Sequence, residues 1–218
     1  MVYDNLEGIS NNYTLYLAKI ILEITEEIFG KDNIQYPEEL FWVVFEYKEL
    51  YKYDEALYYS KKLVESAVRI FGKESEEYTF YLMSLASNYS YNGHYSESLR
   101  YNFEALELLD NIEGKSGENY LVCLNNIAYV YRSLGNDEDA LNYYLKVLKI
   151  RNDKKDNDFE YLFSVLSNVA STYGDLGMDS IAHKYYFKAL QIYNENPNCC
   201  SHLDIAFLYT DLATTFIS

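Results

Sequence analysis

The sequence predicts an all-α fold, in which antiparallel helix pairs repeat along one axis as an α-solenoid. The first observation is a fixed interval of 42 residues, which separates Gly30, Gly72 and Gly114. The same interval relates three further sets, which are Ala56, Ser98, Ala140 and Ala182, then Tyr47, Tyr89, Tyr131 and Tyr173, then Ala86, Ala128 and Ala170. A fixed interval of this size indicates that one supersecondary unit is copied and stacked.

The second observation is helical periodicity within each copy, which is clearest from Glu118 to Asn152. A first apolar stripe consists of Leu121, Leu124, Ile127, Ala128 and Tyr131, and a second consists of Ala140, Leu141, Tyr144, Val147 and Leu148. Each stripe has the spacing of one helix face. Gly135 lies between the two stripes, and because glycine is common at helix C-termini it indicates the end of the first helix. Two helices that each expose an apolar face must pack on each other and on neighbouring copies.

The remaining copies follow in order along the chain, so we predict a single array over residues 1–218. It begins with a partial repeat, 1–36, in which Tyr13–Gly30 forms the second helix of a copy. Four repeats follow at about 37–75, 76–117, 118–158 and 159–201, and a partial repeat at 202–218 has only a first helix. Both prolines, Pro37 and Pro197, fall between repeats, where a missing N–H costs least.

Composition narrows the class of partner. The formal net charge is −16, from 34 acidic and 18 basic side chains, so nucleic acid is excluded as a ligand because phosphate binding needs a cationic surface. A basic peptide partner would be favoured by this charge. The cysteines are Cys123, a predicted core residue, and the adjacent pair Cys199 and Cys200, which do not form a disulfide framework. We therefore expect a reducing, cytoplasmic setting.

No chemistry-bearing motif emerges from the sequence. There is no GxSxG, phosphate loop, HExxH or CxxC, and the scattered histidines have no metal-ligand spacing. The chain has no signal-peptide pattern at its start and no apolar run approaching the ~20 residues of a membrane span. We therefore expect no enzyme activity, no metal, no cofactor and no membrane.

The repeat resembles the tetratricopeptide repeat (TPR). The motif positions are Leu124, Ile127, Ala128, Tyr131, Ala140, Tyr144 and Val147 in one copy, and Leu166, Val169, Ala170, Tyr173, Ala182, Tyr186 and Ala189 in the next. The usual unit has ~34 residues. The 42-residue unit resembles the kinesin-light-chain-like subclass, with Leu124–Ala128 and the Phe-Gly pairs at Phe29 and Phe71 as matching stretches. The resemblance implies a right-handed superhelix whose first helices line a concave face.

The same resemblance implies a peptide-binding groove. In similar proteins an Asn on the first helix holds the backbone of an extended peptide, and a carboxamide suits this because it both donates and accepts. The groove candidates are Asn126 and Asn168, their equivalents Ser84 and Trp42, and the neighbouring Phe45, Tyr129, Arg132, Ser171 and Asp175. The alternative for the asparagines is simple solvation of an exposed helix face.

Two groove candidates have competing interpretations. Trp42 is a candidate hot spot, although we favour its burial beneath the first helical segment. Arg132 is suited to bind a ligand carboxylate, and a neighbouring Asp or Glu is equally able to take it.

The leading function predicted from the sequence is a non-catalytic protein- or peptide-binding scaffold that uses the concave face. One alternative is a sensor or regulatory module of a larger signalling or effector protein, because broken first and last repeats leave apolar faces that need a cap. A second alternative is a self-assembling module, a homo-oligomer formed through the open terminal helix at Ile205–Ile217.

Overall fold

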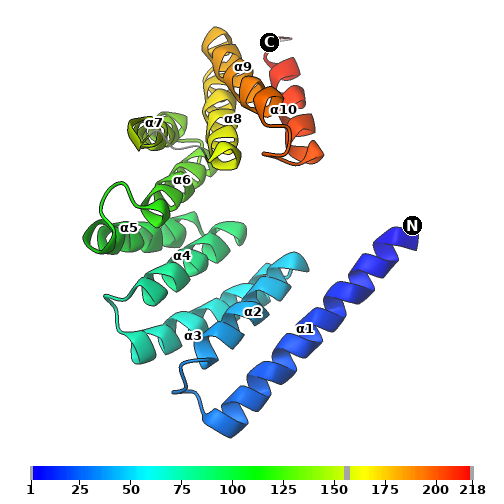
Figure 1. The fold of residues 1–218 in the computed structure, drawn as a ribbon, viewed down its shortest axis with the longest axis vertical. Coiled ribbons are helices and arrows are strands. Elements are labelled where there is room, and N and C mark those ends of the chain that lie inside the picture. The colour runs from blue at the N-terminus through cyan, green and yellow to red at the C-terminus, as the bar shows by residue number, and fades with distance from the viewer. Residues whose placement is uncertain (1, 155–157, 217–218) are drawn as a thin grey trace. The chain divides into compact units, whose positions relative to one another are not determined.

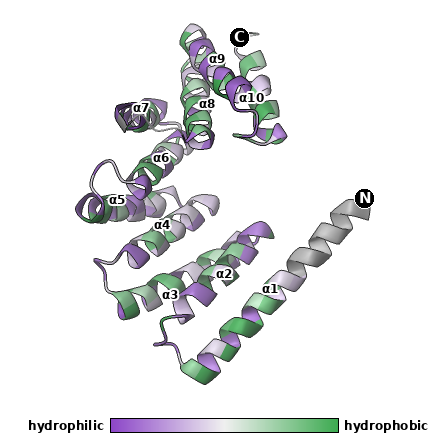
Figure 2. Cartoon of the chain, in the orientation of Figure 1, coloured by the Kyte–Doolittle hydropathy of each residue, from purple (hydrophilic) through white to green (hydrophobic). Residues whose placement is uncertain are grey.

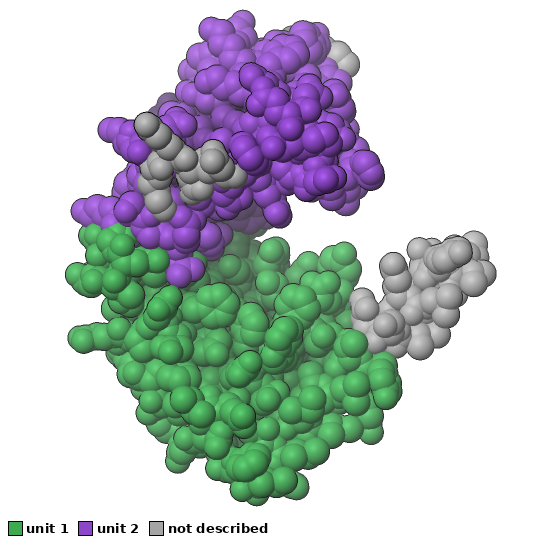
Figure 3. All heavy atoms as spheres, in the orientation of Figure 1, with its two compact units in different colours: residues 1–114 green, residues 115–218 purple. Residues whose placement is uncertain are grey.

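The computed structural model describes residues 2–154 and 158–216, and throughout these ranges the regular structure is helical, without a strand. Two compact units divide the chain, residues 1–114 and 115–218, and they are coloured separately in Figure 3. The predicted all-α fold class is confirmed.

Unit 1 consists of one long helix followed by two antiparallel hairpins (Figure 1). The long helix is α1 (Val2–Phe29), the first hairpin pairs α2 (Tyr36–Glu49) with α3 (Tyr53–Phe71), and the second pairs α4 (Glu76–Tyr91) with α5 (Tyr95–Ile112). Each helix packs on the next one along the chain.

Unit 2 has two hairpins followed by one short helix. The hairpins pair α6 (Glu118–Ser133) with α7 (Asp137–Lys154), and α8 (Phe159–Asp175) with α9 (Asp179–Glu195). The last helix is α10 (His202–Thr214), which contacts both α8 and α9. In both units, hydrophobic and hydrophilic residues are interspersed along the helices (Figure 2), as expected for helices that bury one face and expose the other.

A stacked pair of tyrosines marks every hairpin. Ring centroids lie 5.4 Å apart in Tyr47–Tyr59 and Tyr89–Tyr101, 5.7 Å apart in Tyr131–Tyr143 and 5.5 Å apart in Tyr173–Tyr185. Each pair joins the first helix to the second, and near-parallel stacking at this distance adds to the stability given by burial. The sequence period is therefore repeated as a period of side-chain contacts.

The small residues of the repeat lie in the helix interfaces, as predicted. Ala86, Ala128 and Ala170 have no exposed surface, and neither does Cys123, so its assignment to the core is confirmed. At the end of α6, Gly135 has φ of 75° and its N–H donates to the Arg132 carbonyl at 2.9 Å. A residue with a side chain is strained at this φ, which explains the glycine at this turn.

The first helix is longer than the sequence indicated. We expected it to begin near Tyr13, after Gly8, but α1 begins at Val2 and Gly8 lies within it. A glycine inside a helix costs only about 1 kcal/mol relative to alanine, so a helix that is otherwise favourable continues through it. The predicted repeat boundary at residue 158 follows residues 155–157, which lie outside the described residues.

Candidate functional site

Two groove candidates of unit 1, Trp42 and Phe45, belong to a cluster of aromatic rings on the first helices of its hairpins. Phe41, Trp42 and Phe45 come from α2, and Phe80 and Tyr81 come from α4; these five residues are the aromatic patch. The Phe41 and Phe80 ring centroids lie 5.4 Å apart, so the patch joins the two helices. Trp42 is 48% exposed, Phe80 47% and Phe45 40%. The expected burial of Trp42 beneath α1 is therefore wrong.

Ser84 lies on α4 one turn beyond this patch and is half-buried. Its backbone carbonyl accepts a hydrogen bond from the Asn88 side chain at 3.0 Å. Asn88 is fully buried and also donates to Ser60 Oγ at 2.7 Å, so it ties α4 to α3. The neighbourhood of Ser84 is thus part of the interface between the α2–α3 and α4–α5 hairpins.

In unit 2 the groove candidates come from α6 and α8. Asn126 is half-buried and Tyr129 is 50% exposed, so both reach solvent from the same face of α6. From α8, Asn168 lines a cavity of about 300 Å³ between α8 and α10. The cavity wall carries three carboxylates, which are Glu160, Asp204 and Asp211.

Arg132, Ser171 and Asp175 are brought together by the fold. Arg132 Nε donates to Asp175 Oδ2 at 2.8 Å, and Arg132 Nη2 donates to Ser171 Oγ at 2.5 Å. Burial lowers the pKa of Arg132, and the hydrogen bond and charge of Asp175 raise it, with a net rise. The carboxylate that Arg132 binds in this structure is therefore Asp175, the neighbouring acid that the sequence allowed for.

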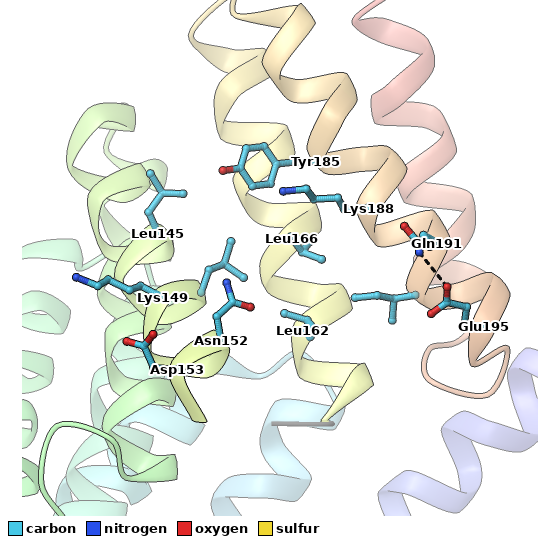
Figure 4. Close-up of a pocket in the computed structure, with 12 residues that line it drawn as sticks. Leu145, Lys149, Asn152, Asp153, Leu162, Leu166, Tyr185, Lys188, Gln191 and Glu195 are labelled. Carbon is cyan, nitrogen blue, oxygen red and sulfur yellow. Dashed lines mark hydrogen bonds between the residues drawn. The ribbon is translucent and has the colours of Figure 1, made fainter. Parts of the chain in front are cut away.

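Sequence reasoning missed most of the wall of the cavity between α8 and α10. Phe207 from α10 and Cys200 from the preceding turn also line it. The one available signal was the equivalence of Asp211 to Asn168 across the repeat, which places both on the same helix face. A larger cavity, of about 640 Å³, lies between α7, α8 and α9 and contains none of the predicted groove residues (Figure 4).

Neither a metal site nor a membrane-spanning helix is found in the described part of the chain. Residues 2–154 and 158–216 contain no group of three or more His, Cys, Asp or Glu side chains arranged to hold a metal ion. Within the same ranges, no helix combines the length and apolar character needed to cross a membrane.

The hairpins stacked in each unit define a helical-repeat protein, and comparison with known proteins identifies the kind of repeat. Residues 97–153 match the tetratricopeptide repeat family. No match was found among curated protein sequences. Residues 97–153 are therefore similar to the tetratricopeptide repeat, and the fold of the chain is similar to the folds of kinesin-light-chain-like structures.

Three solved structures illustrate the similarity. BtubC (BKLC) from P. vanneervenii is 17% identical, with a TM-score of 0.76 over 88% of this chain and 77% of that one. A putative kinesin light chain from P. anserina, with nearly identical TPR-like repeats, is 13% identical, with a TM-score of 0.75 over 88% and 90%. PlcR from Bacillus thuringiensis, solved in complex with the peptide PapR7 and DNA, is 13% identical, with a TM-score of 0.65 over 97% and 71%.

Proposed function

We propose that this chain is a non-catalytic module that binds a protein or peptide segment against the first helices of its hairpins. Asn126 and Asn168 hold the backbone of the segment, since each carboxamide can donate and accept as a peptide group does. The observation that carries this proposal is the position of Asn168 in the wall of a 300 Å³ cavity. PlcR, which has a similar fold, was solved with a bound peptide.

The chemistry of the cavity favours a cationic residue in the bound segment. Glu160, Asp204 and Asp211 line the same wall as Asn168, and Phe207, which is 60% exposed, adds an aromatic surface. A lysine or arginine side chain would place its methylenes on the ring and its charge among the carboxylates. The formal charge of −16 would further speed the encounter with a basic segment.

The exposed side chains of the aromatic patch offer a second anchoring point, in unit 1. Trp42 and Phe45 have centroids 5.9 Å apart and are arranged edge to face, so they present two faces of an apolar surface. Aromatic residues of this kind contribute most of the binding energy in many interfaces. The patch suits an apolar residue of a bound segment.

Selection from a displayed library of 12-residue peptides tests this proposal, with affinities measured by fluorescence anisotropy. We expect selected peptides to be rich in Lys and Arg, and Asn168→Ala to weaken them about tenfold, the equivalent of about 1.4 kcal/mol of lost hydrogen bonding. Asn126→Ala is expected to act in the same direction. The matched control is Asn142→Ala, which removes an exposed carboxamide from α7. Peptides that bind all four proteins equally would refute the groove.

Self-association is a second candidate function, because α1 exposes an apolar stripe. Leu17, Ile21, Ile24 and Ile28 are 39%, 47%, 47% and 67% exposed. Ile21 is equivalent, 42 residues earlier, to Leu63, which is fully buried in the α2–α3 hairpin. Among the described residues, α1 is thus a second helix without the first helix of its hairpin.

The helix α10 has the complementary property, since it is equivalent to a first helix and no second helix pairs with it among the described residues. Tyr209 on α10 is 53% exposed, whereas its equivalent Leu166 on α8 is 6% exposed. We propose that α10 of one copy packs on α1 of another and completes a hairpin. Such a head-to-tail contact is heterologous and extends into a chain of copies.

Complementary variants test this contact in sedimentation velocity. Ile24→Glu blocks the α1 face and Tyr209→Glu blocks the α10 face, so each variant alone is expected to be monomeric, while their mixture forms dimers only. A concentration-independent monomer for the unmodified chain would refute self-association and leave peptide binding unaffected.

A further inference from the structure

The cavity of about 640 Å³ in unit 2 lies between the second helices α7 and α9, with α8 as its floor (Figure 4). Leu145 and Lys149 reach it from α7, Leu162 and Leu166 from α8, and Lys188 from α9. Cavities that bind small ligands have volumes of ~300–1,000 Å³ and mostly apolar walls with a few polar groups. This cavity has such a volume, and its wall has an apolar part, which consists of Leu145, Leu148, Leu162, Leu166 and Ile192, beside several polar and charged side chains.

The first helix of each of the other three hairpins has a tyrosine at the position that Leu162 occupies in α8. At intervals of 42 residues, these tyrosines are Tyr36, Tyr78 and Tyr120. These tyrosines are 6%, 3% and 3% exposed, so each ring fills the space beside its own hairpin. In the α8–α9 hairpin this ring is missing, and Leu162 lines the cavity instead.

The neighbouring Tyr161 does not take the place of the missing ring. Its hydroxyl donates to the Leu121 carbonyl at 2.9 Å, and its ring lies 4.4 Å from the Arg151 guanidinium. Tyr161 is not among the residues that line the cavity. The space beside Leu162 is therefore not filled by a shift of one residue along the helix.

The polar partner of the missing phenol is still present. Tyr78 Oη donates to Glu104 at 3.0 Å, and Lys146 Nζ donates to Tyr120 Oη at 3.2 Å, so the partner lies 26 residues after the tyrosine in both hairpins. The residue 26 positions after Leu162 is Lys188, which lines the cavity. An ammonium group, 4.9 Å from the Tyr185 ring centroid, thus occupies the position from which two of the other hairpins bind a phenolic oxygen, whereas Tyr36 in the α2–α3 hairpin donates to Glu26 instead.

We propose that this cavity binds the phenol ring of a ligand, which replaces the tyrosine ring missing at Leu162. The ring packs between Leu145, Leu162 and Leu166, and Lys188 Nζ donates a hydrogen bond to the phenolic oxygen. The ring comes either from a free phenol or from a tyrosine side chain of a partner. Because the lining residues are distinct from Asn126 and Asn168, the proposals for this site and for the peptide groove can be tested, and refuted, independently of each other.

The probes are p-cresol, its analogue toluene, which lacks the hydroxyl, and the tripeptide acetyl-Gly-Tyr-Gly-amide. Binding to the full chain is followed through the leucine methyl resonances of Leu145 and Leu166. We expect p-cresol to bind about tenfold more tightly than toluene, because a hydrogen bond from a charged donor is stronger than one between neutral groups and this site is partly open to solvent. Lys188→Met is expected to remove that advantage and leave toluene binding unchanged.

The decisive variant is Leu162→Tyr, which restores the residue of the other hairpins. It should raise the melting temperature by about 2–5 °C, as cavity-filling changes do, and abolish binding of p-cresol. Leu203→Tyr is the control, because it makes the same substitution at an exposed position of α10 outside the cavity and should leave p-cresol binding unchanged. Tighter binding of the tripeptide than of p-cresol would assign the site to a partner tyrosine, and equal binding would assign it to a free phenol. Absence of binding by both, or p-cresol binding that survives Leu162→Tyr, would overturn the proposal.

Discussion

Replacing Glu118 by glutamine should destabilise unit 2 through a buried cation. Arg151 is only 5% exposed, and its Nη2 lies 2.6 Å from Glu118 Oε2 and 3.8 Å from Asp158 Oδ2. A hydrogen bond between charged groups contributes ~1.5–3 kcal/mol. The Glu118 side chain is 55% exposed, so we expect the low end of that range, about 1.5 kcal/mol.

Replacing Arg151 itself should lower the free energy of unfolding by less than replacing Glu118. Arg151→Met removes the buried charge together with its bond and leaves an apolar chain of similar length beside Tyr161. Replacing a buried ion by a well-packed apolar residue is often neutral, whereas removing one partner leaves a charge uncompensated. We therefore expect Arg151→Met to change stability by less than about 0.5 kcal/mol, and Glu118→Gln to have no further effect in the Arg151→Met background.

Urea unfolding followed by circular dichroism gives the stabilities, and hydrogen exchange in α6–α8 localises the change. Local measurement matters because repeat arrays need not unfold in one step. Glu65→Gln serves as control, since it removes an exposed carboxylate from α3. The reasoning is refuted if Arg151→Met loses more stability than Glu118→Gln.

Three further variants or modifications test the packing of unit 2. Tyr144→Phe should raise the unfolding free energy by about 1 kcal/mol, because the Tyr144 hydroxyl is buried and finds no hydrogen-bond partner among the described residues; a loss in urea unfolding would contradict this. Asp175→Asn should lower it by about 1 kcal/mol, since the ion pair with Arg132 is partly exposed, and an unchanged urea midpoint would speak against that pair. Burial raises the pKa of Cys123 to about 12, so at pH 8 a thiol reagent should modify Cys123 only after unfolding, and its rapid labelling in the native protein would show the thiol to be accessible.

The sequence was sufficient to predict the helix pairs because the packing rules act at every repeat. Small residues such as Ala128 and turn glycines such as Gly135 recur at 42-residue intervals. The small residues recur because helices pack closely at each repeat, and the glycines recur because each turn needs a positive φ. Arg151 shows where this reasoning ends. Its equivalents are Ala67 and Leu109, and only the three-dimensional positions of Glu118 and Asp158 explain a cation at a core position.

The candidate site was less accessible to prediction for the same reason. The Arg132–Asp175 pair spans 43 residues, one more than the repeat, so a search at the repeat interval does not find it. The cavity beside Leu162 was also missed, because a leucine at a helical apolar position gives no sign that it has replaced a larger ring. Departures from a repeat become informative only when the contacts of the regular positions are known.

The half-exposed indole of Trp42 has a practical consequence for all of these experiments. It is the only tryptophan of the chain, so fluorescence excited at long wavelength comes from one known position beside Phe41 and Phe45. A molecule that covers it would exclude water and shift its emission to the blue, whereas one held only in unit 2 would leave the spectrum unchanged. The protein therefore carries an intrinsic optical reporter that distinguishes occupants of its two halves without any label.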